Sequence, residues 1–364
     1  MFTLIYVIGA ILLLSVLIIV HEFGHYIFAV ATGMRVDRFS VIGIGPPIVN
    51  LFTYKGTEFV ISAIPFGAYV HIVGMEAPDD EELAEEERAR AACLAAGQED
   101  ETQYLFRNRP VWARILTIFG GPLANYLAAM VIFFSLFTIA GTQIETAVRV
   151  DSLTSETAKA SELTEGDELV AIAGESVQGR SAMARVRKVA GKHSGTTVDV
   201  TVNRSGEEVT VPVPISEQGR LGILLDASQT EWEPMSAGVA ARNAVIQPFR
   251  ITEMQLRALG GLIVGTTDAE VGGPVAIVDQ IRKSAKTGMF QFFWIGAVIS
   301  TVLGMINLLP IPALDGGRLV FLVYEVIARR PANRRIEEMV HGIGMLALLG
   351  LIALVTIRDI GKFF

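Results

Sequence analysis

Long apolar runs alternate with polar stretches along the chain, and four of the runs are long enough to cross a bilayer. They cover residues 4–31, 115–140, 291–311 and 339–357. A helix needs about 20 apolar residues to cross roughly 30 Å of hydrocarbon. The pattern therefore predicts a multi-pass α-helical membrane protein with about four transmembrane helices. The first run is too long for a cleaved signal peptide and lacks the basic start of one.

A β-like pattern follows the first apolar run. Residues 51–74 alternate β-forming side chains around Lys55-Gly56, which predicts a hairpin, and Ile64-Pro65-Phe66-Gly67 predicts a second break. The segment is apolar but too interrupted to span a membrane. Strands at membrane depth must have their backbone groups satisfied within the protein. We therefore expect a re-entrant β-hairpin packed beside the first span.

Residues 145–228 are polar and differ in character from the apolar runs around them. Short runs of β-forming residues separated by Gly174-Glu175 and Ser205-Gly206 predict strands, and residues 181–190 predict a helix. We expect a small α/β domain inserted between two spans. The expected division is membrane core 1–144, inserted domain 145–228, a linker 229–290 with an amphipathic helix over 241–259, and membrane core 291–364.

Charge and cysteine content exclude several classes of protein. The net charge is −8, and eleven acidic residues lie within 76–101. This pattern predicts a solvated helical insertion, within residues 76–106 on the cytoplasmic side, rather than a site. There is no basic footprint for nucleic acid. Cys93 is the one cysteine, so the chain can form neither an internal disulfide nor a Cys-based zinc cluster.

Basic residues predict the orientation of the spans, because Lys and Arg favour short cytoplasmic connections. They are concentrated after the first span and between the third and fourth spans. These residues are Arg35, Arg38, Lys55, Arg107, Arg109, Arg114, Arg329, Arg330, Arg334 and Arg335. The inserted domain and both termini are therefore expected outside the cytoplasm. Arg282, Lys283 and Lys286 argue against this orientation, but they lie in a long translocated region, where the rule is weak.

The first apolar run contains the pattern H-E-x-x-H, from His21 to His25. Residues four apart share one face of a helix, so His21 and His25 can bind one metal ion. Glu22 is then suited to act as a general base for a water molecule. A charged group at the bilayer centre costs about 2.5–3.5 kcal/mol, so such groups should face a bundle interior or a watered cavity. The alternative is two unrelated histidines near a helix end.

A third ligand is needed, because catalytic zinc usually has three protein ligands and one open position. Asp315 follows the third apolar run directly, after two prolines that break the helix, Pro310 and Pro312. A carboxylate held there would complete a site of two imidazoles and one carboxylate. The alternative is that Asp315 caps the N-terminus of a helix over 316–327.

These motifs resemble those of a known family. The chain resembles the site-2 protease family of intramembrane zinc metalloproteases, and within that family it resembles the bacterial group that processes anti-sigma factors. Two motifs carry this resemblance, His21–His25 (HEFGH) and Asn307–Gly317 (NLLPIPALDGG). Ala68 stands where the family has a glycine. The inserted domain resembles a single PDZ domain. Three more stretches agree: Ile64–Val70, Gly121–Asn125 (GPLAN) and Gly272–Ile277 (GGPVAI).

The resemblance implies a zinc metalloendopeptidase of the bacterial inner membrane that acts in regulated intramembrane proteolysis. Its substrates would be single-span membrane proteins, such as anti-sigma factors or remnant signal peptides, cut within or near their transmembrane segments. The PDZ-like domain would bind a peptide C-terminus or act as a size filter. The expected zinc ligands are His21, His25 and Asp315, the catalytic residue is Glu22, and the residues that contact substrate are Asn307 and Asn125. For Asn125, a helix–helix hydrogen bond is the alternative.

Two other functions fit parts of the sequence. One is a membrane-anchored PDZ adaptor with a vestigial metal site, although an adaptor has no need of a glutamate within the membrane. The other is a metal transporter, but transporters usually show repeat-related sites, and this chain has one HExxH and no internal repeat.

Overall fold

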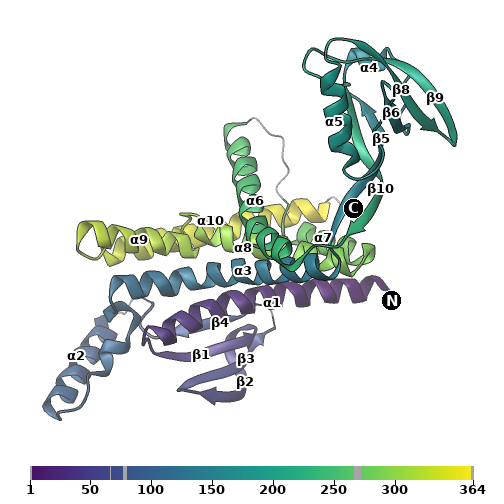
Figure 1. The fold of residues 1–364 in the computed structure, drawn as a ribbon. Helices are drawn as coiled ribbons and strands as arrows, with labels where there is room; N and C mark the ends of the chain where they lie inside the picture. Colours follow the sequence, from purple (N-terminus) through teal and green to yellow (C-terminus); the bar gives the residue numbers. More distant parts are fainter. Residues whose placement is uncertain (1, 66, 77–79, 266–271, 362–364) are drawn as a thin grey trace. The chain divides into compact units, whose positions relative to one another are not determined.

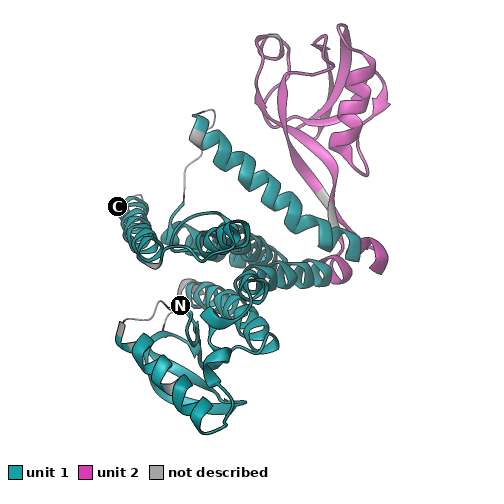
Figure 2. Ribbon diagram, turned by 90° about the vertical axis from the view of Figure 1, so that its left-hand side faces the viewer, with its two compact units in different colours: residues 1–136, 241–364 teal, residues 137–240 magenta. Residues whose placement is uncertain are grey.

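The computed structural model describes residues 2–65, 67–76, 80–265 and 272–361. The chain divides into two compact units, residues 1–136 with 241–364 and residues 137–240 (Figure 2). Parts of three predictions lie outside the described residues. These parts are Phe66 in the expected break, 77–79 in the acidic segment and 266–271 in the expected linker.

Within the described residues, four helices are long and apolar enough to cross a membrane, as predicted (Figure 1). They are α1 (Phe2–Ala31), α3 (Val111–Ile139), α8 (Met289–Leu308) and α10 (Arg334–Gly361). Only 6% of the most apolar window of α10 is buried within the protein. An apolar surface of that extent needs a covering that is not water, so lipid is its natural solvent.

A four-stranded sheet follows α1, and it is larger than the hairpin expected from the sequence. Its strands are β1 (Val36–Ile42), β2 (Ile44–Tyr54), β3 (Thr57–Ile64) and β4 (Tyr69–Ile72), in the order β2-β3-β1-β4. The predicted hairpin is present: β2 and β3 are antiparallel around Lys55 and Gly56. Both turn residues have positive φ, 49° and 84°, as a two-residue hairpin turn of type I′ requires. β1 pairs with β3 in parallel and with β4 antiparallel.

Aromatic packing holds this sheet against the first span. Tyr26 of α1 contacts Phe39 of β1 and Phe59 of β3, with ring centroids 5.7 and 5.5 Å away. The two phenylalanines lie 5.4 Å apart. Such pairs bury large apolar area in defined geometry. As a result β4 lies against α1, while β2 forms the far edge, with every residue exposed.

The remaining helices of this unit include two that the sequence predicted. α2 (Asp80–Ala95) forms in the acidic segment, and α6 (Ala237–Val264) covers the helix expected over 241–259. α7 (Pro274–Thr287) was not expected. Its first turn is bound by the buried Asp359 of α10, which accepts hydrogen bonds from the amides of Gly273 and Ala276, both at 3.0 Å. The other short helices are η1 (Glu101–Tyr104), η2 (Phe106–Asn108) and α9 (Asp315–Ala328).

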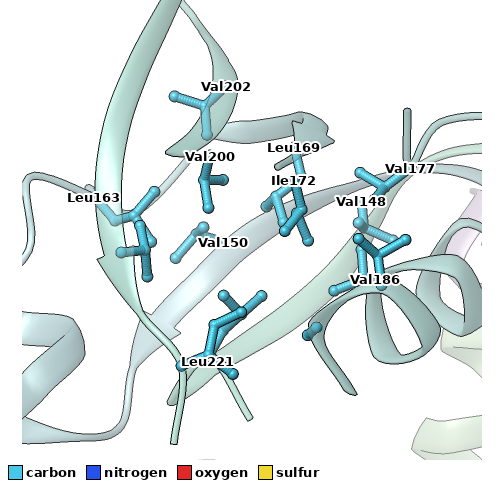
Figure 3. Packing of buried hydrophobic residues seen from close by; sticks show 14 of the residues in the cluster. Val148, Val150, Leu163, Leu169, Ile172, Val177, Val186, Val200, Val202 and Leu221 are labelled. Carbon is cyan, nitrogen blue, oxygen red and sulfur yellow. The ribbon is translucent and has the colours of Figure 1, made fainter. Parts of the chain in front are cut away.

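The second unit is a sheet with one longer helix, in line with the predicted α/β insertion. Its strand order is β10-β5-β6-β8-β9, with β7 paired to β6. Val148, Leu169 and Val200 are fully buried in its core, which Val186 of α5 completes (Figure 3). The elements are β5 (Thr142–Leu153), α4 (Glu156–Lys159), β6 (Glu168–Ile172), β7 (Glu175–Ser176), α5 (Ala182–Lys192), β8 (Thr197–Arg204), β9 (Glu207–Pro214) and β10 (Ile223–Glu233).

Asp167 makes a buried ion pair beside this core, and we expect Asp167→Asn to destabilise the second unit. Its carboxylate accepts hydrogen bonds from Arg204, at 2.8 and 2.7 Å, and from the backbone amide of Thr164. Burial alone would raise the pKa of Asp167, but the bonds from Arg204 and Thr164 outweigh burial and lower it. Leaving such a buried group badly paired costs about 1–3 kcal/mol.

The pH dependence of this loss follows from the direction of the pKa shift. The carboxylate stabilises the folded state above the pKa of an unfolded Asp, about 3.9, and that contribution is lost as the pH falls through the lower folded value. Hydrogen exchange of β6 and β8 in the full-length protein should therefore show faster opening of Asp167→Asn at pH 7. The difference should shrink as the pH falls through 4. Equal protection at pH 7 would contradict the assignment.

Candidate metal centre

The two histidines of the HExxH pattern lie one turn apart on α1 and are both buried, at 6% and 5% exposed. The helix brings them close to α3, because glycines meet where the two helices approach. A Cβ atom on Gly24 would lie only 2.2 Å from the carbonyl oxygen of Gly120. Only residues without side chains allow backbones this close. The imidazoles of His21 and His25 therefore lie against the backbone of α3.

Asp315 comes from the far end of the chain and meets both histidines. Its Oδ2 lies 3.0 Å from Nε2 of His21 and 3.3 Å from Nε2 of His25. The two Nε2 atoms are 3.2 Å apart. Asp315 is the first residue of α9, and Leu314 occupies the capping position without a side-chain capping bond. The structure therefore does not place Asp315 in the capping role that was its alternative reading.

The loop between α8 and α9 sets the position of Asp315. Ala313 has a φ of 74°, which is strained for a residue with a side chain. Its amide donates a hydrogen bond to Nδ1 of His341 in α10, at 3.1 Å. A Cβ atom on Gly316 would lie 2.0 Å from the carbonyl oxygen of Leu309. The glycine after Asp315 is thus required for this turn, and α10 helps to hold it.

The hydrogen bonds around His25 define which ring nitrogen is available. Nδ1 lies 2.9 Å from the carbonyl oxygen of Thr117, which can only accept, so Nδ1 carries the proton. Nε2 of His25 is then the nitrogen with a free lone pair. This nitrogen lies close to both Nε2 of His21 and the carboxylate of Asp315. Three electron-pair donors converging in this way suit a cation, and two imidazoles with a carboxylate are zinc ligands.

Gly121 of α3 leaves room for this group of donors. A Cβ atom at this position would lie 2.4 Å from Nε2 of His25 and 2.9 Å from Nε2 of His21. A side chain of any size would press on the two nitrogens that face the carboxylate. The three candidate ligands, whose donor atoms lie within 4.8 Å of one another, therefore fit a bound metal ion.

Glu22 borders a cavity of about 380 Å³ beside these donors. Its Oε2 accepts a hydrogen bond from the amide of Val70 in β4, at 3.2 Å. The cavity is also bordered by all three candidate metal ligands. A carboxylate next to the metal donors and open to a cavity can exchange protons with a water molecule held there.

The two asparagines predicted to contact substrate occupy different places. Asn307 of α8 borders the cavity, and its Nδ2 donates to the carbonyl of Leu303, at 3.0 Å. Asn125 of α3 is fully buried and does not border the cavity. Its amide lies 3.0 Å from Nδ1 of His21. Substrate contact therefore stays a prediction that suits Asn307, and the structure places Asn125 in a helix–helix contact, the alternative reading.

Sequence reasoning missed several groups at this centre. The carbonyl of Thr117 and the amide of Val70 are backbone groups, which leave no mark in a sequence. Arg318 also borders the cavity, one turn of α9 beyond Asp315. The spacing of three from Asp315 was a readable signal for that position, since residues three apart share a helix face.

Comparison with known proteins gives full-length similarity to metalloproteases. A model described as "Peptidase family M50" matches residues 9–351. A protein of Agrobacterium fabrum named "Putative zinc metalloprotease" is 33% identical, over 98% of this chain and 96% of its own length. "Zinc metalloprotease RasP" of Geobacillus kaustophilus is 28% identical, over 98% of both chains.

Proposed function

The chain belongs to peptidase family M50, and on that basis we propose that it is an intramembrane zinc metalloprotease, hydrolysing peptide bonds within or near the transmembrane segments of single-span membrane proteins. The observation that carries the proposal is the meeting of His21, His25 and Asp315 beside Glu22 at one cavity. His21, Glu22 and His25 lie on α1, and Asp315 follows α8; both α1 and α8 are long and apolar enough to span a membrane. Anti-sigma factors and remnant signal peptides are the substrate classes that we propose.

The three ligands would hold Zn²⁺, which when bound polarises a peptide carbonyl and activates a water molecule. Glu22 takes the proton of the attacking water and delivers it to the leaving nitrogen. The amide of Val70 holds the carboxylate of Glu22 in position. Asn307, at the cavity wall, is suited to hydrogen-bond the substrate backbone.

We propose that the substrate is bound as an extended segment along β4. A transmembrane helix keeps its peptide bonds within internal hydrogen bonds, so a segment of it must unwind before hydrolysis. β4 is an edge of its sheet, and Val70, His71 and Ile72 border the cavity. Main-chain pairing at such an edge fixes an extended peptide regardless of its side chains. β2 forms the edge of the sheet opposite β4, and all of its residues are exposed. Its exposed apolar side chains support the proposal that this edge enters the bilayer.

The groove of the second unit supports the proposal of a PDZ-like peptide site. A cavity of about 830 Å³ lies between α5 and the start of β10, which is the edge strand of its sheet. Arg187 and Arg220 border it, together with the apolar Val186 and Leu221. Basic side chains beside an apolar groove and a free strand edge suit a peptide that ends in a carboxylate.

The proposed orientation places the second unit and both termini outside the cytoplasm of a bacterial cell, with the protein in the inner membrane. Reporter fusions at residue 190 should then report an outer location, and fusions at residues 90 and 332 a cytoplasmic one, because the basic connections stay inside. Fusions after the fourth span provide the internal control, since they should match residue 190. An outer location for residue 90 would reverse the orientation.

Zinc binding by the purified protein tests the proposed function directly. The wild type should contain one zinc per chain. Loss of a residue that only hydrogen-bonds a metal ligand weakens metal binding ~10–100-fold. Asp315→Ala removes a proposed ligand itself, so its zinc affinity should fall by more than that. Asp151→Ala, an exposed aspartate of the second unit, is the control. Full zinc occupancy in Asp315→Ala with retained cleavage would exclude that ligand. A wild type free of zinc would favour the adaptor function.

A further inference from the structure

Asn125 is a buried polar residue whose side chain meets a histidine of the metal centre from behind. It is fully buried on α3, and its backbone carbonyl accepts a hydrogen bond from Ser300 of α8, at 2.9 Å. Its amide lies 3.0 Å from Nδ1 of His21, on the side of the ring away from Asp315. Burying an amide costs free energy unless its hydrogen bonds are made.

An imidazole that binds a metal through Nε2 needs a hydrogen-bond acceptor at Nδ1. The lone pair of Nε2 is used for the metal, so Nδ1 carries the proton of the neutral ring. His25 has such an acceptor, the carbonyl of Thr117. For His21, the hydrogen-bond partner that the described part of the chain provides at Nδ1 is the amide of Asn125.

A carboxamide can turn either of its ends toward the ring. Nδ2 would donate to an unprotonated Nδ1, which leaves the proton on Nε2, and Oδ1 would accept from a protonated Nδ1, which leaves the lone pair on Nε2. With Nδ2 facing the ring, Oδ1 of Asn125 is buried without a hydrogen-bond partner among the described residues. No described donor therefore opposes a half turn of the amide, and only the Oδ1 arrangement leaves Nε2 able to bind zinc.

We propose that Asn125 is a positioning residue that holds His21 as a metal ligand by accepting the Nδ1 proton through Oδ1. The inference rests on the proposed function, in which His21 binds zinc. It gives Asn125 no direct contact with substrate, in keeping with its absence from the cavity wall. If Asn125 only helped to pack the helices, zinc binding would not depend on whether the side chain at position 125 can accept a hydrogen bond. The positioning role requires an acceptor, so an experiment can separate the two roles.

The test compares two replacements of nearly equal size in the full-length protein. Asn125→Leu offers neither donor nor acceptor, and Asn125→Asp offers only acceptors. Zinc affinity, measured by competition with a chelator, should fall about 10–100-fold in N125L, as for other outer partners of metal ligands. N125D should stay within about threefold of the wild type, well below the ~10–100-fold loss expected for N125L. Ser300→Ala, which removes the neighbouring α8–α3 hydrogen bond without touching the ring, should keep wild-type affinity.

Each outcome decides between the alternatives. Wild-type zinc affinity in N125L, or an equal loss in N125L and N125D, would overturn the positioning role. Thermal unfolding of each variant checks the fold, and Asn125→Ala provides the same comparison if N125L does not fold. A wild-type protein that binds no zinc would instead overturn the proposed function and the inference with it, so the two failures can be told apart.

Discussion

Glu22→Gln is expected to abolish peptide-bond hydrolysis while zinc stays bound. Gln has nearly the size of Glu and can still accept the hydrogen bond from the amide of Val70, so packing should change little. It also removes a charge that is costly in the membrane, so stability should hold or rise. Gln cannot accept the proton of the attacking water. General-base catalysis contributes roughly 10²–10⁴-fold, and this residue serves in two proton transfers, so the loss should lie at the upper end.

The assay is cleavage of a pre-trimmed single-span substrate in liposomes, with zinc measured on the same sample. Glu58→Gln is the matched control: this partly exposed carboxylate on β3 pairs with Arg38 and does not border the cavity, so the variant should cleave like the wild type. Wild-type cleavage by a zinc-loaded Glu22→Gln protein would rule out Glu22 as the general base, whereas a wild type that cleaves nothing would favour the adaptor. Captured single-span proteins that accumulate with the inactive variant would identify the physiological substrates.

Gly121→Ala is expected to disable the metal centre by adding one methyl group. That methyl would lie 2.4 Å from Nε2 of His25 and 2.9 Å from Nε2 of His21, so the rings or α3 must move. Displacement of catalytic groups by about 1 Å can cost on the order of 10²-fold in rate. Helix propensity acts in the opposite direction, because Ala is favoured over Gly by about 1 kcal/mol within a helix. Any loss must therefore come from the crowded donors.

Zinc content and cleavage of this variant should both be low while its helical circular dichroism is unchanged. Gly9→Ala is the matched control on α1, because a Cβ atom at Gly9 meets nothing within 4 Å. If Gly121→Ala bound zinc fully and cleaved substrate at the wild-type rate, the metal could not lie between the two rings and Asp315 in the arrangement described.

Features that follow short-range rules were predictable from the sequence. The four spans follow from unbroken apolar runs, and the pairing of His21 with His25 follows from their spacing on a helix. The turn at Lys55-Gly56 was readable because glycine permits the positive φ that a hairpin needs. Asp315 could be predicted as the candidate third ligand because it directly follows an apolar run that is long enough to span a membrane.

Features that depend on packing between distant segments were not predictable. β1 lies between β3 and β4, and its Phe39 packs on Tyr26 and Phe59. The sequence of residues 36–42 gives no signal that predicts these contacts. The place of Asn125 behind His21 depends on how closely α1 approaches α3, which the glycines at their contact determine. A sequence pattern gives the faces of each helix, but the distance between two helices is decided by the side chains of both.

The metal centre joins parts of the chain that the ribosome makes at very different times. His21 and Asp315 are 294 residues apart. At roughly 5–20 residues per second, synthesis of that length takes about 15–60 s. The loop that carries Asp315 is also tied to His341 of the last span. A nascent chain therefore lacks one of the three candidate metal ligands while it is inserted into a membrane that holds other proteins. The order of synthesis itself delays assembly of the active site.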